Sequence, residues 1–394
     1  MSDHPMDTVG AEMPPKRSLL VVGSEARRWV NEPDGAMPGG LRWHLTAVDT
    51  AAEVQQALST GAFDVAAIDV RPGATLWESL MAAPSPALMA IRSAGEFLPP
   101  GLNWVDRKAS RTSLVREANR TLQLQRLLSA PALARLLGAR EQLPAVPAVY
   151  LRVLELTSRP DTSAADIAEA VEADPGLSIQ VLHLVNSAFF GLAQRTTSIQ
   201  HAVAYLGVEM IKGLILTSHV LDALKQVDQK GLSVEVFQTY ALRVARLARR
   251  FVRNPALSDE IFTAAVLHDI GKLLLALKHP AAFQETVRKV SEDGANEKQV
   301  EREAFGATHS ELGAYFLSGW GIPFQVVECV AYHHDPENVH GESKEILAVV
   351  HGADALLGIE SLKEPAGRLN EAFLEEAGFK AELPRWRELA RKHA

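Results

Sequence analysis

Short apolar runs alternate with helical patterns over residues 18–110. The runs cover residues 18–22, 43–48, 64–68, 87–91 and 103–105, and each has the length of a buried strand. Between the second and third runs, Asp49 or Thr50 can cap a helix that ends near Gly61. Strands separated by helices predict parallel βαβ units, and we expect a doubly wound five-stranded α/β sheet.

The pattern changes after the last of these runs. Residues 111–138 are helical in pattern throughout and are expected to form a connecting helix. From Leu143 onward helical periods dominate, interrupted by prolines and glycines, which predicts an all-α second domain. Its apolar stretch 203–221 has no clean polar face and should be buried centrally. Ser258 is a candidate N-cap, and Pro323 can begin a helix that ends at His333 and His334.

The ends of the chain have their own patterns. Residues 1–17 are expected to be a disordered leader, because Asp3, His4, Asp7 and Glu12 precede any apolar run and do not fit a signal peptide. The tail from Pro384 predicts a short charged helix with Trp386 on one face. That helix could serve docking or dimer contacts, or be a frayed terminus.

Composition narrows the class of protein. The 394 residues are 47% hydrophobic with a formal charge of −8, which indicates a globular chain of two or three domains. The acidic balance argues against nucleic-acid binding. Cys329 is the only cysteine, so no intrachain disulfide can form and a reducing cytoplasm is expected. The most apolar region, residues 261–277, is interrupted by His268, Asp269 and Lys272, so no membrane span is expected.

The first half resembles a response-regulator receiver domain over residues 18–126. The stretch 63–69, with Asp69 ending the third strand, carries most of the likeness. In receivers the corresponding aspartate accepts a phosphoryl group. Here Gly23-Ser24 replaces the acidic pair that holds magnesium, and Ile91 takes the hydroxyl position. Arg107 or Lys108 takes the lysine position. The resemblance therefore implies a degenerate receiver used for docking or dimerisation, with phosphorylation of Asp69 disfavoured.

The second half contains histidines and aspartates that could ligate one centre. Adjacent His268 and Asp269 offer an imidazole and a carboxylate from one segment, and His309, His333-His334 and Asp354 follow. Such ligands suit iron, manganese, zinc or nickel. No single spacing is diagnostic, and an isolated histidine among helices is usually a core or surface residue.

Five further motifs lie in this half, at residues 143–147, 167–178, 182–191, 198–203 and 206–207. Through them, residues 127–357 resemble an HDOD domain, the signalling relative of the HD phosphohydrolases. The resemblance implies that His268, Asp269, His309, His333, His334 and Asp354 correspond to metal ligands of the enzymes. Lys272 is the catalytic candidate, because it corresponds to a lysine that can contact substrate phosphate. Residues 358–394 would be a C-terminal helical extension.

Two departures from the enzymes accompany this resemblance. Tyr240 stands where they have their first histidine, and a phenol is a poor replacement for imidazole. The related cyclic-dinucleotide phosphodiesterases also have a Gly-Tyr-Pro segment after the double histidine, whereas Asp335 and Pro336 follow it here. In one interpretation the cluster still binds metals and activates water. In the other it is a buried hydrogen-bonded network.

The resemblance favours a cytosolic signal-transduction protein with a non-catalytic output domain that acts by protein–protein interaction. Diguanylate cyclase or histidine-kinase systems are the implied partners, and a homodimer is compatible. The alternatives are a metal-dependent phosphodiesterase acting on a cyclic nucleotide or dinucleotide, and a nucleotide sensor using the same cleft. Asn186, Ser187, Phe189 and Phe190 could line a ligand or partner groove, or form a tight turn. Arg243, Arg246, Arg249 and Arg250 form either a phosphate-reading stripe or a solvated helix face.

Overall fold

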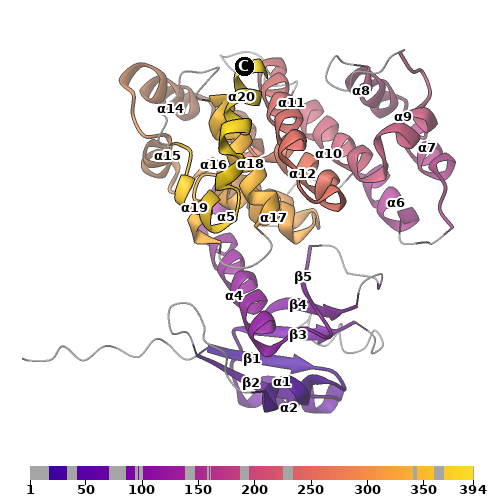
Figure 1. The fold of residues 1–394 in the computed structure, drawn as a ribbon, viewed down its shortest axis with the longest axis vertical. Coiled ribbons are helices and arrows are strands. Elements are labelled where there is room, and N and C mark those ends of the chain that lie inside the picture. Colours follow the sequence, from indigo (N-terminus) through magenta and orange to yellow (C-terminus); the bar gives the residue numbers. More distant parts are fainter. Residues whose placement is uncertain are drawn as a thin grey trace, which may run out of the picture. The chain divides into compact units, whose positions relative to one another are not determined.

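The chain divides into two compact units, one of residues 1–98 and 102–123 and one of residues 99–101 and 124–394. The computed structural model describes residues 17–32, 42–70, 86–93, 96, 101–137, 147–157, 159, 161–186, 195–224, 234–339, 344–358 and 368–393. Almost all of the expected leader and of the loop 187–194 lies outside these ranges. Figure 1 shows strands in the first unit and, in the second, helices throughout.

The first unit contains a parallel five-stranded sheet with the strand order β2-β1-β3-β4-β5. The strands are β1 (Arg17–Val22), β2 (Trp43–Val48), β3 (Val65–Asp69), β4 (Ala87–Arg92) and β5 (Asn103–Asp106). This order is one of the two common doubly wound arrangements. The predicted α/β architecture is therefore confirmed.

Both faces of this sheet are covered by helices, which are α1 (Ala26–Asn31), α2 (Ala51–Thr60) and α4 (Arg111–Leu128). Successive residues of β1 point to opposite faces. Leu19 therefore packs with Trp29 of α1 and Leu114 of α4, and Leu20 packs with Val54 of α2. Thr50 and Glu53 form a capping box at the start of α2, which confirms the predicted helix start.

The second unit is helical in all of its described elements. In chain order after α4 the helices are α5 (Pro131–Leu137), α6 (Ala148–Thr157), α7 (Ala164–Glu172), α8 (Pro175–Val185), α9 (Ile199–Leu206), α10 (Val208–Leu224), α11 (Val234–Phe251), α12 (Ser258–Leu267), α13 (Ile270–Lys278), α14 (Pro280–Asp293), α15 (Glu297–Phe305), α16 (His309–Gly319), α17 (Phe324–Tyr332), α18 (Glu345–Leu357), α19 (Glu371–Glu376) and α20 (Leu383–His393). Short 3₁₀ turns cover Pro255–Leu257, Pro336–Asn338 and Lys380–Glu382. The apolar helix α10 buries Met210, Ile211 and Leu214, as predicted.

Two helix boundaries differ from the prediction. The expected helix over 111–138 is broken at Ser129 and Ala130, because Pro131 has no N–H to continue the ladder and instead begins α5. Ser258 is not a cap: it is the first residue of α12, after the turn Pro255–Leu257 that Asn254 caps. A proline is the local signal in both cases.

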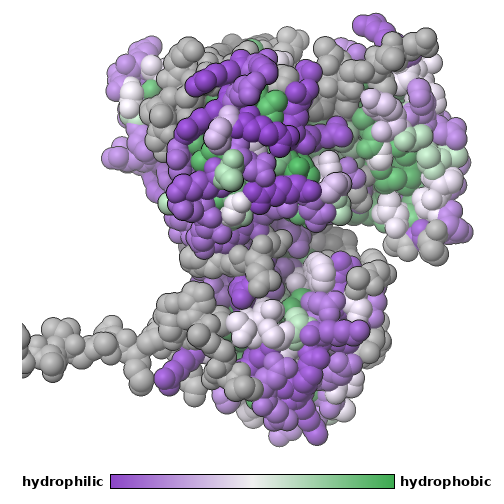
Figure 2. Space-filling view, viewed as in Figure 1, coloured by the Kyte–Doolittle hydropathy of each residue, from purple (hydrophilic) through white to green (hydrophobic). Residues whose placement is uncertain are grey.

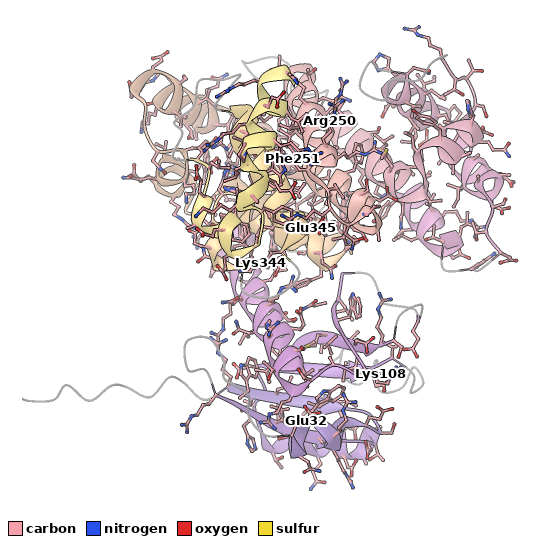
Figure 3. The ribbon with its side chains drawn as sticks, viewed as in Figure 1. Glu32, Lys108, Arg250, Phe251, Lys344 and Glu345 are labelled. Atoms are coloured by element: carbon pink, nitrogen blue, oxygen red, sulfur yellow. The ribbon has the colours of Figure 1, made fainter. Side chains whose placement is uncertain are left out.

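The C-terminal helix α20 is packed rather than frayed. Trp386 is fully buried and stacks on Phe251 at the end of α11, with ring centroids 4.2 Å apart and planes 3° apart. Figure 3 labels Phe251 where α20 lies over α11. Gly352 of α18 makes room, since a Cβ there would lie 2.6 Å from the indole. Trp386 is therefore not on an exposed docking face.

Candidate functional site

The break between α12 and α13 places His268 and Asp269 in the core of the second unit. His268 Nδ1 lies 2.7 Å from the carbonyl oxygen of Ala265, and its side chain is fully buried. Gly271 lets α13 cross α16 closely, because a Cβ there would lie 1.9 Å from the carbonyl oxygen of His309. The glycine after the His-Asp pair thus sets the approach of the next ligand element.

His309 is the first residue of α16, whose start is fixed by a capping box of Thr308 and Glu311. Its Nδ1 lies 2.8 Å from Oε1 of the buried Glu301, and its backbone N–H donates to the other oxygen of that carboxylate. An N–H at Nδ1 that donates to Glu301 makes Nε2 the nitrogen that a metal ion could bind in place of a proton. His309 Nε2 lies 3.2 Å from Oδ1 of Asp269.

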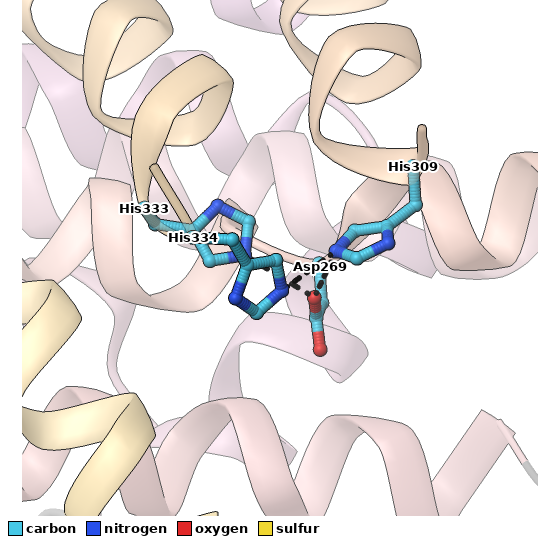
Figure 4. A group of neighbouring side chains, drawn as sticks. All are labelled: Asp269, His309, His333 and His334. Atoms are coloured by element: carbon cyan, nitrogen blue, oxygen red, sulfur yellow. Dashed lines mark hydrogen bonds and ion pairs between the residues drawn. The ribbon is translucent and has the colours of Figure 1, made fainter. Parts of the chain in front are cut away.

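His333 and His334 follow the last turn of α17. His333 Nδ1 lies 2.9 Å from the carbonyl oxygen of Val330, and its Nε2 lies 3.6 Å from Oδ1 of Asp269. His351 of α18 supports this turn through a 2.7 Å contact from its Nδ1 to the carbonyl oxygen of His333. His334 Nε2 lies 3.1 Å from His309 Nε2. Figure 4 shows His309, His333 and His334 around Asp269.

Asp354 of α18 completes the group from the opposite side. Its Oδ1 accepts a 2.9 Å hydrogen bond from the hydroxyl of Tyr240 and lies 3.4 Å from His268 Nε2. Its Oδ2 lies 2.9 Å from a guanidinium nitrogen of Arg368, which also reaches His334 Nδ1 at 3.3 Å. The structure therefore brings His268, Asp269, His309, His333, His334 and Asp354 together, with Tyr240 beside them.

Lys272 lies one turn after Asp269, where its Nζ is 3.2 Å from Asp269 Oδ2 and 3.0 Å from Glu297 Oε1. Its side chain is 20% exposed, as is that of Arg368. The histidines and aspartates beneath are almost completely buried. The cluster therefore has two basic side chains at its more open edge.

Burial and neighbouring charges act in opposite directions on the pKa values. Burial tends to raise the pKa of Asp269 and of Asp354, but the charges of Lys272, Arg368 and His268 outweigh it and hold both well below the usual range. Burial tends to lower the pKa of His309, but Glu301 and Asp269 raise it to about 10. The same competition, with Asp269 and Asp354 as partners, raises the pKa of His268.

The other two histidines behave in the opposite way. Burial lowers the pKa of His333, and burial together with the charges of His333 and His309 lowers that of His334 well below its usual value. Both rings are therefore neutral near pH 7. The carboxylates are ionised at that pH, so the centre combines negative charge with imidazole lone pairs.

The donor set suits a cation. Three buried atoms, His268 Nε2, Asp269 Oδ1 and His333 Nε2, have no hydrogen-bond partner among the described residues. Two groups of candidate ligands, one of Asp269, His309, His333 and His334 and one of His268, His333 and Asp354, each hold their atoms within 4.8 Å of one another. Bonds of about 2.0–2.2 Å to one ion place neighbouring ligands about 3.0–3.5 Å apart, close to the separations seen here. These residues fit a divalent metal.

Asp69, the aspartate at the position that receivers phosphorylate, has a different environment. Asp69 is 3% exposed, and Arg107 donates to both of its oxygens at 2.8 and 3.1 Å. Arg107 also contacts Ser93 and Glu96. Gly23 packs directly on Asp69, since a Cβ there would lie 2.7 Å from the Cβ of Asp69. Arg107 is thus the residue at the position that receivers give to lysine, and it forms a buried ion pair with Asp69 at the end of β3.

A separate groove of about 450 Å³ lies beside α8, lined by Ile179, Leu182, His183, Asn186, Arg195, Thr196 and Thr197. Asn186 has a structural role there, because its side chain bonds the backbone N–H and carbonyl of Thr196 and so ties the end of α8 to that residue. Ser187, Phe189 and Phe190 lie outside the described residues. Figure 2 shows hydrophobic surface over the part of the unit that contains α6 to α9.

The arginines of α11 differ in exposure. Arg246, Arg249 and Arg250 are exposed, whereas Arg243 is partly buried. The backbone carbonyl of Arg250 accepts a hydrogen bond from Arg385 of α20. The solvated-face interpretation therefore fits this helix better than a phosphate-reading stripe.

Comparison with known proteins places the cluster in a described family of helical domains. Residues 143–336 match the HDOD domain family. The helical unit carries an HDOD domain. A curated uncharacterized protein of Treponema pallidum is 24% identical over 214 residues, which are 53% of this chain and 41% of that protein. The chain thus spans about two fifths of the length of that relative.

Solved structures share the fold. An HDOD domain protein of unknown function from Geobacter sulfurreducens is 23% identical, with 69% of this chain and 99% of that chain covered and a TM-score of 0.51. A candidate signal transduction protein from Marinobacter aquaeolei VT8 is 22% identical, with 79% and 78% covered and a TM-score of 0.55. A candidate phosphohydrolase from Shewanella amazonensis SB2B is 22% identical, with 68% and 100% covered and a TM-score of 0.50. At these identities the likeness concerns the fold.

Sequence reasoning missed four residues of the centre: Glu297, Glu301, His351 and Arg368. Glu301 lies on an amphipathic helix among other acidic residues, and only its burial distinguishes it. Arg368 lies beyond the part of the chain that matches the family. Among the described helices, none combines the length and hydropathy needed to span a bilayer.

Proposed function

We propose that this is a signalling protein whose HDOD domain recognises a protein partner and holds a divalent metal in its buried cluster without hydrolysing a phosphodiester. The observation that carries the proposal is the state of Asp354. One of its oxygens is bonded to Tyr240 and the other to Arg368. A carboxylate occupied on both oxygens has little capacity left for a second ion.

Asp269, His309 and His333 would hold the ion, with His268 beside Asp269 and Glu301 orienting His309. The ion would supply positive charge to a centre that has three unsatisfied buried acceptor atoms. In this role it joins the segments around α12, α16 and α17, and its binding free energy adds to the stability of the fold. Iron, manganese, zinc and nickel all suit this donor set.

The partner surface belongs to the same proposal. Large hydrophobic side chains are exposed on neighbouring helices, with Leu151 on α6 51% exposed, Ile179 on α8 70% and Tyr205 on α9 54%. Ile179 also lines the groove beside α8, and exposed apolar side chains of this kind can form contact surfaces. The five-stranded unit, with Asp69 held by Arg107, would act as a docking element for signalling proteins of diguanylate cyclase or histidine-kinase systems.

The test combines metal content with turnover. Full-length protein purified without chelator should contain metal, and the His268→Ala variant should contain less. With manganese or iron added, cyclic dinucleotides should be hydrolysed no faster by the native chain than by His268→Ala. Hydrolysis that disappears in His268→Ala would instead establish the phosphodiesterase.

That second candidate is favoured by one observation. Lys272 lies at the more open edge of the cluster, where a basic side chain could steady the charge of a phosphate beside a metal. Its Nζ is, however, paired with both Asp269 and Glu297. This pairing makes it less suited to bind a substrate phosphate.

A further inference from the structure

Arg368 is a basic side chain that contacts a residue from each of the two groups of candidate ligands, His334 from one and Asp354 from the other. Its guanidinium donates to Oδ2 of Asp354 at 2.9 Å and lies 3.3 Å from Nδ1 of His334. Asp354 is 2% exposed, so the ion pair is shielded from water. An arginine keeps its charge at every physiological pH. Arg368 is therefore a permanent cation within the ligand set.

The contact with His334 has a chemical consequence. A guanidinium only donates hydrogen bonds, so Nδ1 of His334 must accept from it. An imidazole that accepts a hydrogen bond at Nδ1 carries its ring proton on Nε2, which here is the atom 3.1 Å from His309 Nε2. In this tautomer Nε2 has no lone pair with which to bind an ion.

The contact with Asp354 acts in the same direction. Its Oδ2 is engaged by Arg368, and Oδ1 is bonded to Tyr240. In contrast, Oδ1 of Asp269 has no hydrogen-bond partner among the described residues and faces Nε2 of His309 and Nε2 of His333. The two carboxylates therefore differ: one is open to an ion and the other is engaged.

From these contacts we infer that Arg368 occupies the place of a second cation, so that the centre binds one divalent ion at Asp269, His309 and His333 and excludes His334 and Asp354 as ligands. This inference rests on the proposed metal binding and specifies its stoichiometry. Arg368 is a positioning residue here, because it would act through His334 and Asp354. Its removal should free both of them.

The experiment is a titration of chelator-stripped full-length protein with Co²⁺, followed by calorimetry and by the visible absorption of the bound ion. The native chain should bind one equivalent. Arg368→Met, which keeps the length and apolar stem of the side chain, should bind Co²⁺ about tenfold more tightly or take up a second equivalent, since one nearby charge has an effect of this order. The absorption spectrum should change as new ligands enter. Arg385→Met, an exposed arginine of α20 paired with Glu382, is the matched control and should behave as the native chain.

Two further variants separate the inference from general loosening of the fold. Arg368→Lys keeps the charge and should show a smaller gain. His334→Ala should change Co²⁺ binding little in the native background but should remove part of the gain in Arg368→Met. A native chain that binds two ions, or an Arg368→Met variant with native stoichiometry, affinity and spectrum, would overturn the inference alone. Absence of binding in every variant would overturn the proposed metal centre as well.

Discussion

Each unit contains a buried aspartate, Asp69 in the first and Asp269 in the second, and the surroundings of the two side chains are opposite. Asp69 in the first unit is held on both oxygens by one arginine. Asp269 in the second faces three imidazoles and has an oxygen with no hydrogen-bond partner among the described residues. Arg107 engages both oxygens of the first carboxylate, whereas Lys272 and His268 lie at only one oxygen, Oδ2, of the second.

This contrast explains how the two resemblances should be interpreted. A receiver site needs its aspartate open to a phosphoryl donor and to magnesium, and Arg107 with Gly23 takes up that space. The helical cluster instead places imidazole nitrogens around a carboxylate, a set of donor atoms that suits a divalent cation. The two aspartates have the same side chain. What distinguishes them is whether both carboxylate oxygens are already hydrogen-bonded, as in Asp69, or one is left to accept an ion, as in Asp269.

The largest effect should come from removing the counter-charge in the first unit. Arg107→Met removes the hydrogen bonds of Arg107 to the carboxylates of Asp69 and Glu96. Loss of one member of a buried ion pair lowers the free energy of unfolding by about 3–5 kcal/mol. We expect urea unfolding of the first unit at markedly lower denaturant concentration. The double variant Arg107→Met with Asp69→Leu should recover much of this loss, because no unpaired charge remains buried. Equal instability of the single and double variants would contradict the ion-pair account.

The same comparison predicts that Asp69 does not accept a phosphoryl group. Incubation of the full chain with a small phosphodonor and Mg²⁺ should leave its mass unchanged. A phosphorylated species that is lost in Asp69→Asn would show that the Arg107 pair opens in solution.

The next effect concerns the close helix crossing in the second unit. In Gly271→Ala the new methyl group would overlap the carbonyl oxygen of His309, so α13 and α16 must separate. We expect a loss of about 3 kcal/mol of stability, at the upper end of ordinary overpacking, together with weaker metal binding. Gly176→Ala on α8 is the control, since its Cβ meets only a carboxylate oxygen at 3.4 Å. Thermal unfolding of both variants measures the difference.

The sequence predicted the fold well where burial is uniform. The strands of the sheet are short apolar runs buried on both faces, and such runs can be located from hydrophobicity alone. The break at Pro131 was missed because Leu127, Leu128 and Leu133 continue a helical period across it. Local backbone chemistry overrode the side-chain pattern at that point.

The site was predictable only as far as its ligands. The order of the histidines and aspartates indicated that they converge, and the structure brings them together. The residues that contact these ligands, Glu301 and Arg368, could not be predicted, because the packing of the helices decides whether they come within hydrogen-bonding distance. No spacing in the chain links Arg368 to Asp354 or His334.

A smaller effect is expected from the carboxylate behind His309. Glu301→Gln keeps a hydrogen-bond acceptor for Nδ1 but removes the charge that makes the ring a stronger ligand. Partners of this kind contribute about 10–100-fold to metal affinity. We therefore expect a loss within that range for Co²⁺ or Zn²⁺, measured by calorimetry. Glu303→Gln, an exposed residue of the same helix, is the control and should leave affinity unchanged. Equal effects of the two substitutions would mean that Glu301 acts only through overall charge.

The smallest effect tests the comparison most directly, because Lys272 is the counterpart of Arg107. Arg107 donates to both oxygens of its aspartate, whereas Lys272 contacts only one oxygen of Asp269. Each of the two also pairs with a glutamate, Arg107 with Glu96 and Lys272 with Glu297. The partly exposed pair of Lys272 with Asp269 should contribute about 0.5–1 kcal/mol. Lys272→Met should therefore destabilise the metal-free protein slightly and, by removing a repelling charge, tighten Co²⁺ binding about two- to fivefold. Lys278→Met on the same helix is exposed and should change neither quantity. A loss of affinity in Lys272→Met would mean that Lys272 orders the ligands, and the two aspartates would then differ less than their contacts indicate.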